Sequence, residues 1–561
     1  MKMNERNAQL KSALGAMAPK ERVVESHNLP KEDTVNRQGH AAYSVADELR
    51  LVAMLNTLKI EPQAYRNETE MMRELRDLIE KIGIKDPYFL AQAIVWSRCM
   101  GEGMRSINHL AATLAAPFIA GQEWARRFYG PFDKRNQRGG CIFRPDDMSE
   151  IKDVWAALNK KSGSEKMKSL PNAMKKGFAK AIETLDTYSL AKYKSSIIDV
   201  SNLVHPNPEN SKATLPDGMK VIDALMKGIA VTADTWEAAQ SEAGQEVAKA
   251  VKEGKLSKSE AEKVLAEAKA DNWESLLMDG KLGILAALRN IRNIMKTPRA
   301  NAIHKWCELI TNKEKIRKSL ILPIHFDLAY EIVMEEFDRA DYSPTVQQAL
   351  LDGYAAAIPN LKDALPGRTC VIVDCSGSMH TGISRDGKAP NARVRWGIYE
   401  NDPLFHTTCS YKAGLIAATI AKATGADIVR FGSGAQWYTQ RQNLNLFSLA
   451  REISKANMGG TDLSTAFDLL TREHKAYDRI IVVSDNEING RVTSRAYQKY
   501  IHDVCSPYVY ACDMAAYGTT PLKNDGKVNY YFGYGPAFYE DIARKEFNPS
   551  EKLELIRKVV I

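Results

Sequence analysis

The spacing of apolar residues changes once along this chain, at about residue 360, and this change constrains the fold more than any other feature. From about residue 44 to 357, apolar residues recur at intervals of three and four, which is typical of amphipathic helices. Leu51, Met54 and Leu55, for example, fall on one helical face. After residue 360, short apolar strands alternate with helices, and this alternation predicts a parallel, doubly wound sheet. We therefore expect an all-helical part followed by an α/β part.

The helical part consists of segments joined by short polar or Pro/Gly links, as expected for antiparallel helix pairs. Roughly 300 residues of such pairs without one obvious centre favour an α-solenoid, in which each pair covers the apolar face of its neighbour. No exact repeat period is visible, so an irregular helical domain stays open as the alternative. Residues 235–273 are rich in Ala, Glu and Lys, with a break at Gly254, and predict a solvent-exposed helical hairpin.

The composition is that of a globular protein with more than one domain, because 561 residues exceed the usual size of a single core several-fold. No run of apolar residues is long enough to cross a membrane, and the first residues lack the apolar core of a secretory signal. The eight cysteines are scattered, with no CxxC pair and no zinc-like spacing. We therefore expect a cytoplasmic protein with reduced thiols and no membrane partner.

The net charge of +8 is modest for this length, but it is unevenly distributed. Residues 121–200 hold 16 Lys and Arg against 10 Asp and Glu, which is most of the surplus. A local basic stretch is the usual electrostatic feature of a nucleic-acid-binding surface. A solvated, lysine-rich helical face is the alternative interpretation.

Polar oxygen side chains follow two of the expected strands. Asp374, Ser376 and Ser378 come directly after the strand in VIVDCSGSMH, and Asp485 follows IIVVS. Thr461 lies in a GGTD loop between them. Three hydroxyls and two carboxylates form an oxygen-only ligand set, which is what a hard divalent cation such as Mg²⁺ requires. The sequence therefore predicts a magnesium site at the carboxyl edge of the sheet.

Three other chemistries fit the stretch VIVDCSGSMH less well. A serine-hydrolase elbow would need G-x-S-x-G, and CSGSM does not match it. A phosphate-binding loop would need G-x-x-x-x-G-K-[ST], which is absent. Cys375 as a nucleophile would need a nearby base, and neither His380 nor the more distant His406 and His474 gives a recognisable arrangement. We therefore expect no enzymatic activity.

The pattern D-x-S-G-S, followed by the threonine of GGTD and the aspartate of SDNE, resembles the metal-ion-dependent adhesion site of von Willebrand factor A domains. The resemblance covers roughly residues 366–561. It implies that Ser376, Ser378 and Thr461 coordinate the ion directly or nearly so, and that Asp374 and Asp485 act mainly through bound water. Residues 381–410 depart from the family pattern by their length, and this segment could cap the metal and restrict access to it.

Two segments of the helical part resemble the TROVE domain of Ro-type RNA-binding proteins, namely residues 170–208 and residues 283–297. With the order of the two parts, the resemblance covers nearly the whole chain. It implies a ring of HEAT-like α-helical repeats in residues 1–360, closed by a von Willebrand A (Rossmann-like) α/β domain in residues 361–561. The Ro family binds small noncoding Y RNAs on a basic outer surface and takes single-stranded 3′ ends of misfolded RNAs through the central hole.

Carried over by position, the Ro pattern of Lys, then Tyr-Lys, then a later Leu-x-His corresponds to Lys192, Lys194 and His205 here. The upstream basic pair of the family falls on Lys175 and Lys176. A further basic residue of some relatives is replaced by serine, at residues 195–196. The spacing of Lys175 and Lys176 from nearby apolar residues lets both point outward, whereas Lys192 and Lys194 cannot share one helical face. The proline that follows His205 indicates that a helix ends there.

The sequence thus predicts a noncatalytic ribonucleoprotein component that binds Y-like RNA and misfolded RNA 3′ ends and acts in RNA quality control or as an RNA scaffold. The resemblance implies a monomer and an exoribonuclease tethered through RNA. A metal-dependent protein-interaction or assembly module that uses the von Willebrand A site is the alternative.

Overall fold

The computed structural model describes residues 32–57, 63–100, 105–159, 168–229, 231, 257–280, 282–319, 321, 324–385, 392–400, 402, 404–439, 444–523, 527–532 and 551–561. Among them, no helix combines the length and the apolar character that a membrane crossing needs. All eight cysteines are free thiols, as expected.

A first group of helices follows a short β-hairpin, β1 and β2. The elements of this group are β1 Thr34–Val35, β2 Ala41–Ser44, α2 Asp47–Thr57, α3 Glu68–Lys85, α4 Pro87–Val95, the π-helical η1 Trp96–Met100, α5 Arg105–Leu114, α6 Ala116–Ile119, α7 Ala125–Phe128, β3 Phe132–Asp133, β4 Arg138–Gly139, α8 Asp146–Leu158, α9 Asn172–Glu183, α10 Thr187–Lys192, α11 Lys194–Val204, η2 Pro208–Asn210 and α12 Val221–Met226. Their buried side chains share one apolar core, which runs from Leu51 to Val231.

Local sequence signals fix several ends in this group. Asn67 and Glu70 form a capping box that starts α3, and Pro87 stands at the first position of α4. Gly177 in α9 lets the helix pass against Tyr129, because a Cβ atom there would lie 2.6 Å from the Tyr129 backbone. The packing of α9 on α7 therefore depends on the missing side chain.

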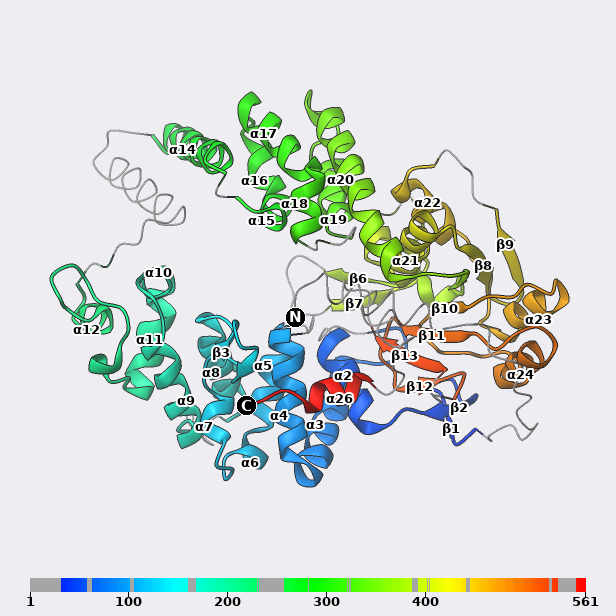
Figure 1. The fold of residues 1–561 in the computed structure, drawn as a ribbon, viewed down its shortest axis with the longest axis horizontal. Helices are drawn as coiled ribbons and strands as arrows, with labels where there is room; N and C mark the ends of the chain where they lie inside the picture. The colour runs from blue at the N-terminus through cyan, green and yellow to red at the C-terminus, as the bar shows by residue number, and fades with distance from the viewer. Residues whose placement is uncertain are drawn as a thin grey trace.

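A second group of helices lies on the other side of the α/β part (Figure 1). Its members are α14 Lys258–Met278, α15 Ile284–Arg289, α16 Ile291–Lys296, α17 Ala300–Thr311, α18 Lys313–Ser319, α19 Ile324–Glu336 and α20 Ser343–Ala364. Residues 232–256, which link α12 to α14, lie outside the described part of the chain. The closed ring of HEAT-like repeats therefore stays a prediction.

The α/β part begins at β5 and alternates strands with helices. Its elements are β5 Thr369–Asp374, η3 Gly377–His380, β6 Gly382–Arg385, β7 Ala392–Arg395, η4 Phe405–Thr407, α21 Cys409–Thr424, β8 Asp427–Phe431, β9 Ala435–Tyr438, α22 Leu446–Ser454, α23 Ser464–Arg472, β10 Arg479–Ser484, α24 Thr493–Asp503, β11 Tyr508–Asp513, β12 Thr519–Thr520, β13 Val528–Phe532 and α26 Glu551–Arg557. The main sheet has the order β13-β11-β10-β5-β8-β9.

All neighbouring strands of this sheet pair in parallel except β9, which pairs antiparallel with β8 at one edge. From β5 the chain passes first to β8 and β9 and then crosses to β10 on the other side, so the strand order reverses beside β5. In open α/β sheets, ligands bind outside the carboxyl ends of the strands at such a reversal. The predicted doubly wound sheet is confirmed, and β9 and β13 are strands that the apolar pattern did not reveal.

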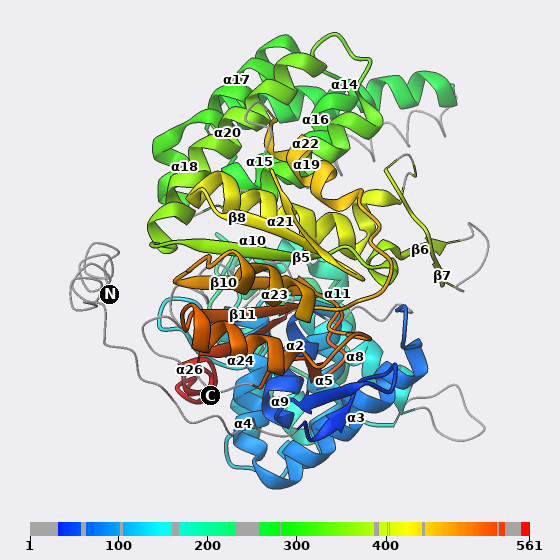
Figure 2. The same cartoon turned by 90° about the vertical axis from the view of Figure 1, so that its right-hand side faces the viewer.

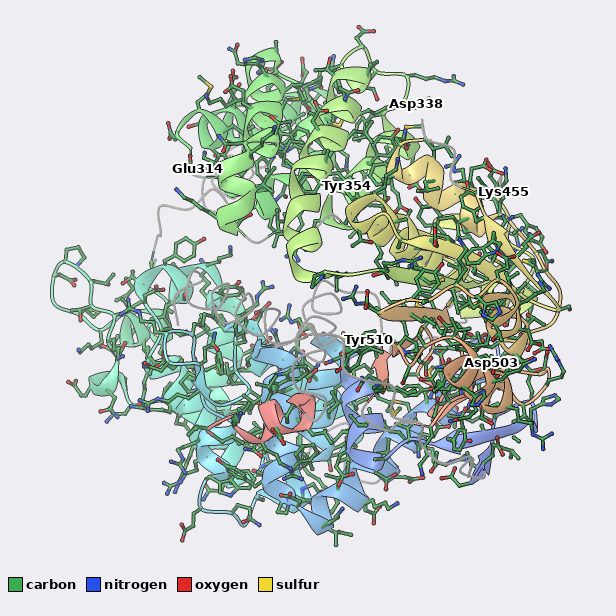
Figure 3. The ribbon with its side chains drawn as sticks, turned by 45° about the vertical axis from the view of Figure 1, so that its right-hand side comes forward. Glu314, Asp338, Tyr354, Lys455, Asp503 and Tyr510 are labelled. Atoms are coloured by element: carbon green, nitrogen blue, oxygen red, sulfur yellow. The ribbon has the colours of Figure 1, made fainter. Side chains whose placement is uncertain are left out.

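The second group of helices and the α/β part share one apolar core. It runs from Trp273 of α14 through α17–α20 into β5 and α21, and Figure 3 labels two of its tyrosines, Tyr354 of α20 and Tyr510 of β11. The rings of Tyr330 and Phe447, from α19 and α22, have centroids 4.5 Å apart. The division at residue 360 stays a prediction, because the core crosses it.

The first group contacts the α/β part through both ends of the chain. Strand β2 pairs with β12, with Tyr43 opposite Thr520. The C-terminal helix α26 packs on α4, and Gln92 Nε2 donates hydrogen bonds to the carbonyls of Arg557 (2.6 Å) and Val559 (2.9 Å). Figure 2 shows α26 beside α4 and the β1–β2 hairpin below the sheet. The α/β part therefore contacts both helical groups.

Leu51, Met54 and Leu55 of α2 are buried, as their spacing predicts, and Val52 and Ala53 are buried as well, because α2 packs against α3, α5 and β13 at once. One expectation about the helices is wrong. The expected exposure of residues 235–273 fails for the end of α14, where Ala270 and Trp273 are buried. The rest of that hairpin, up to residue 256, lies outside the described residues.

Asp327 of α19 is buried at the interface with α21, where Tyr411 Oη donates a 3.4 Å hydrogen bond to its carboxylate. Burial, and then the negative charge of Glu331, raise the pKa of Asp327 well above its ordinary value of 3.8. The unfolded chain therefore loses this proton at a lower pH than the folded protein, and stability falls as the pH rises above about 4. We expect Asp327→Asn to raise the thermal unfolding midpoint at pH 8 more than at pH 5. Scanning calorimetry at the two pH values measures the difference.

The exposed Asp338, which follows α19 (Figure 3), provides the matched control. Asp338→Asn removes the same charge at the surface and should shift the midpoint little at either pH. A gain from Asp327→Asn that is equal at pH 5 and pH 8 would contradict the account.

Candidate metal centre and basic surface

The carboxyl end of β5 carries three of the predicted metal ligands. Asp374 closes the strand, and its Oδ1 accepts a 2.8 Å hydrogen bond from the backbone N–H of Ser376. Its Oδ2 accepts a second one, of 2.5 Å, from Ser484 Oγ at the end of the neighbouring strand β10. Ser376 Oγ and Ser378 Oγ lie 3.3 Å apart. The three side chains therefore form one connected cluster.

Asp485 reaches the same cluster from the loop after β10, and the loop that carries Thr461 lies beside it. Asp485 follows β10, and its carboxylate lies close enough to the side chain of Ser378 for this side chain to lower its pKa against the larger effect of burial. Thr461 is held by Asn489, whose Oδ1 accepts from the threonine N–H at 2.7 Å. The loop of Gly459 is tied to the β5 loop by a 3.1 Å hydrogen bond from Gly377 N–H. All five predicted ligands are at most 5% exposed.

The electrostatics of this edge favour a cation. Burial, together with the charge of Asp485, raises the pKa of Asp374 to about 7, and burial raises the pKa of Asp485. Two further carboxylates lie nearby, and burial and then Asp485 raise the pKa of Glu487 to about 7. Burial likewise raises the pKa of Asp513 to about 7, with Asp485 adding to it. Four buried acids are costly to ionise together, and a divalent cation would offset that cost.

The donor set fits a hard cation. Two carboxylates and three hydroxyls are oxygen ligands, and Mg²⁺ prefers such ligands and retains water. The described residues contain no group of three or more His, Cys, Asp or Glu side chains placed for a metal, and this set is not of that kind. Sequence reasoning did not identify Ser484, Glu487 and Asp513 as part of this site. The signal was available for Asp513, because it ends β11 just as Asp374 ends β5.

Cys375 has the environment of a packing residue. It is fully buried, and burial raises the pKa of its thiol to about 12, with the charge of Asp374 adding to the shift. A nucleophilic cysteine needs its thiolate, which this setting disfavours. His380 is equally buried, and its Nε2 lies 2.9 Å from the Ala456 carbonyl. This geometry agrees with the argument against a cysteine nucleophile.

The predicted RNA-contacting residues lie in the first helical group. Lys176 on α9 is exposed and Lys175 is half-buried, while the buried face of α9 carries Met174 and Phe178. Lys175 and Lys176 are in none of the ion pairs formed within the described residues, and neither is Lys194. These charges are therefore open to an anionic partner.

Lys192 and Lys194 lie on different helices, because α10 ends at Lys192 and α11 begins at Lys194. Lys192 Nζ lies 5.6 Å from the centroid of the Tyr188 ring, which is itself 43% exposed. His205 is the residue that ends α11, in a left-handed conformation with φ of 50°. The prediction that a helix ends there is confirmed, and so is the argument that the two lysines share no helical face.

The carboxyl ends of α9 and α11 lie together, because Glu183 Oε1 accepts a 3.1 Å hydrogen bond from the backbone N–H of Asn207. His205 is two residues before that contact. Lys176 lies seven positions before Glu183, roughly 10 Å along the helix. The basic residues are thus spread along a surface of α9–α11 and are not gathered in one pocket.

Comparisons with known proteins give a likeness at the level of structure. No family model matches the chain, and no curated protein sequence matches it. Among solved structures, it is similar to the crystal structure of the Deinococcus radiodurans RO (RSR) protein. That likeness has a TM-score of 0.57 at 15% sequence identity and covers 90% of this chain and 100% of the other. At this identity the likeness establishes the fold, which is the fold of a Ro protein.

Proposed function

We propose, from the Ro fold of this chain, that it is an RNA-binding protein whose helices α9–α11 contact RNA phosphates. The observation that carries the proposal is the basic surface of those helices, on which the side chains of Lys176, Lys192 and Lys194 are exposed. Lys176 and Lys194 form no ion pair within the described residues. When lysines contact a phosphate backbone, counterions are released from it, and this release drives nucleic-acid binding. Shape and unpaired ends, more than sequence, govern recognition of this kind.

The aromatic residues of this surface support the same proposal. Tyr188 is exposed beside Lys192, and Arg144 Nη2 donates a 3.2 Å hydrogen bond to Tyr193 Oη between the two helices. Aromatic rings next to cations are suited to stacking of unpaired bases, which is worth about 1–3 kcal/mol per base. We infer that the ligand of this outer surface is a small noncoding, Y-like RNA. We infer also that single-stranded 3′ ends of misfolded RNA bind in the central hole of the predicted ring. The role would be RNA quality control or RNA scaffolding in the cytoplasm, as a monomer, with an exoribonuclease tethered through RNA.

We propose further that the α/β part holds Mg²⁺ and performs no catalysis. Asp374, Ser376, Ser378, Thr461 and Asp485 would hold the ion, which supplies a positive centre for oxygen ligands. The buried side chains order three loops through their hydrogen bonds. A protein-interaction module would need the face of this site to be open. Gln38 and Asn36, from the hairpin that precedes the first helical group, donate hydrogen bonds to Glu487 and Ile488 in the loop of Asp485. We therefore favour RNA binding as the main function.

The test is whether purified protein carries RNA. We expect protein purified at low salt to show an excess of absorbance at 260 nm, with small RNAs in the extract that ribonuclease removes. RNA-free protein should then bind a small structured RNA in a filter assay, with a steep loss of affinity as salt rises. Failure to bind any structured RNA at low salt would refute the proposal.

A further inference from the structure

Tyr65 links the first helical group to the metal-site loops. It lies before α3, far in sequence from these loops, yet the side chains of Ser378 and Asp485 lie close enough to its hydroxyl to shift its pKa. Burial, followed by the negative charge of Asp485, raises the pKa of Tyr65 to about 12, and Glu487 and Asp374 add to the shift. These partners place the Tyr65 hydroxyl against the predicted metal ligands.

Tyr65 is held in place by the residues around it. Its backbone N–H donates a 3.2 Å hydrogen bond to Tyr517 Oη, and its ring makes edge-on contacts with the rings of Tyr517 and Trp396 at 5.9 and 6.0 Å. Tyr517 follows β11, and Trp396 follows β7, within the long segment expected to cap the metal. Three aromatic rings from distant parts of the chain thus meet beside the site.

The neighbouring Arg66 fixes the backbone of Tyr65 to the sheet edge. Its side chain is fully buried and donates to the carbonyls of Ala515 (2.9 Å) and Ala516 (3.1 Å) after β11. It also forms a 2.9 Å ion pair with Glu74 of α3. A buried guanidinium with these partners is costly to displace. Residues 65 and 66 are therefore anchored to the α/β part.

The hairpin before α2 contacts the same loops. Gln38 N–H donates to Glu487 Oε2 at 3.2 Å, and Gln38 Nε2 donates to the Glu487 carbonyl at 3.1 Å. Asn36 Nδ2 donates a 2.7 Å hydrogen bond to the Ile488 carbonyl. The loop that carries Asp485 is thus held on one side by its strand and on the other by the N-terminal hairpin.

The charges on the two sides are opposite. The sheet edge carries the buried acids Asp374, Asp485, Glu487 and Asp513. The segment that covers it brings Arg66, whose charge lowers the pKa of Asp513, against the larger effect of burial. The N-terminal segment therefore supplies part of the positive charge that this edge requires, and a bound cation would supply more.

We propose that Tyr65 is the chain's own cap on the metal site, so that cation binding and docking of the N-terminal segment on the sheet edge stabilise each other. The inference rests on the proposed Mg²⁺ site. Because the Tyr65 hydroxyl lies beside Ser378, and because Arg66 and Gln38 are bonded to the same edge of the sheet, a cation that orders Ser378 also orders the docked segment. Linkage is reciprocal: the factor by which the cation favours docking of the segment is also the factor by which docking raises the affinity for the cation. A variant that loosens the segment must therefore bind the cation more weakly. If Tyr65 caps the site, the metal site serves this chain itself: it helps to hold the first helical group on the α/β part.

The experiment uses Tyr65→Phe, which retains the aromatic ring and removes the hydroxyl. Mg²⁺ binding to the metal-free full-length protein is measured by isothermal titration calorimetry. Hydrogen exchange of residues 32–44 and 63–67 is followed without Mg²⁺ and with about 5 mM Mg²⁺, a concentration chosen to saturate the site. We expect wild-type protein to show Mg²⁺-dependent protection of both segments. In Tyr65→Phe we expect affinity about tenfold lower and the protection to be lost.

Tyr88→Phe is the matched control, because Tyr88 lies on α4 against Trp124. It should bind Mg²⁺ as wild type does. If wild type binds Mg²⁺ and Tyr65→Phe binds it equally, with equal protection, the cap is refuted while the metal site stands. If wild-type protein binds no Mg²⁺, the metal site and the cap fall together.

Discussion

Replacing Lys175, Lys176, Lys192 and Lys194 together with alanine is expected to reduce RNA affinity on the order of 100-fold at 0.1 M salt. Each lysine that neutralises a phosphate contributes roughly 0.7–0.9 to the slope of log K against log salt, so the slope should fall by roughly 3. The thermal midpoint should change little, because three of these side chains are exposed and one is half-buried. Filter binding of a small structured RNA over a range of salt concentrations measures both quantities.

A separate variant tests His205, whose left-handed backbone makes alanine a poor choice. His205→Asn keeps a residue that tolerates positive φ and removes the imidazole. This variant should weaken RNA binding, but it should change the slope of log K against log salt by less than the roughly 0.7–0.9 expected for one lysine. An unchanged affinity would remove His205 from the RNA surface and leave the lysines there.

The control for the four-lysine variant removes four exposed cations from the opposite side of the molecule (Figures 1 and 3). They lie on or next to α22, α23 and α24 and are Lys455, Arg472, Arg495 and Lys499. Both variants lose the same net charge, so a non-specific electrostatic effect would weaken RNA binding equally. Equal losses would contradict the assignment of the surface to α9–α11.

The sheet and its carboxyl edge were predictable because their signals are local. VIVD and IIVVSD are runs of β-branched residues that end in an aspartate, and parallel strands bring such ends to one edge. Hydrogen bonds among Asp374, Ser376 and Ser484 agree with that reasoning. The short strands β9 and β13, at the two edges of the sheet, lie outside this pattern, because Gln436 and Asn529 interrupt their apolar runs.

The cover over that edge was not predictable, because its signals are not local. Tyr65 and Arg66 stand in an ordinary polar stretch between two helices, and nothing near them indicates partners more than 300 positions later. The same holds for Gln92, which binds the C-terminal carbonyls of residues 557 and 559. Such contacts depend on how the helical group returns to the sheet, and one sequence carries no record of that path. The exposed end predicted for α14 failed for the same reason, since Trp273 is buried by α17 and its neighbours.

Asp374→Asn is expected to have effects of opposite sign with and without Mg²⁺. Without the cation, Asp374 is a buried acid beside Asp485, and burial and that charge disfavour its ionised form. The neutral amide has the same shape, so it should raise the thermal midpoint of the metal-free protein at pH 8. With the cation, wild type should gain stability, by about 2.7 kcal/mol at one hundred times the dissociation constant, and the variant should gain none. Calorimetric scans with EDTA and with Mg²⁺ measure the four midpoints.

Asp427→Asn separates loss of a metal ligand from loss of any carboxylate on the sheet. Asp427 begins β8 at the opposite end of the strands and accepts a 2.6 Å hydrogen bond from Tyr477 Oη. Its replacement should leave the Mg²⁺-dependent rise intact, because the donor set at the carboxyl edge is unchanged. A rise that persists in Asp374→Asn would mean that the cation binds elsewhere on this chain. A rise that vanishes in Asp374→Asn and persists in Asp427→Asn assigns the cation to the carboxyl edge of the sheet, since Asp374 lies at that edge and Asp427 lies at the opposite end of the strands.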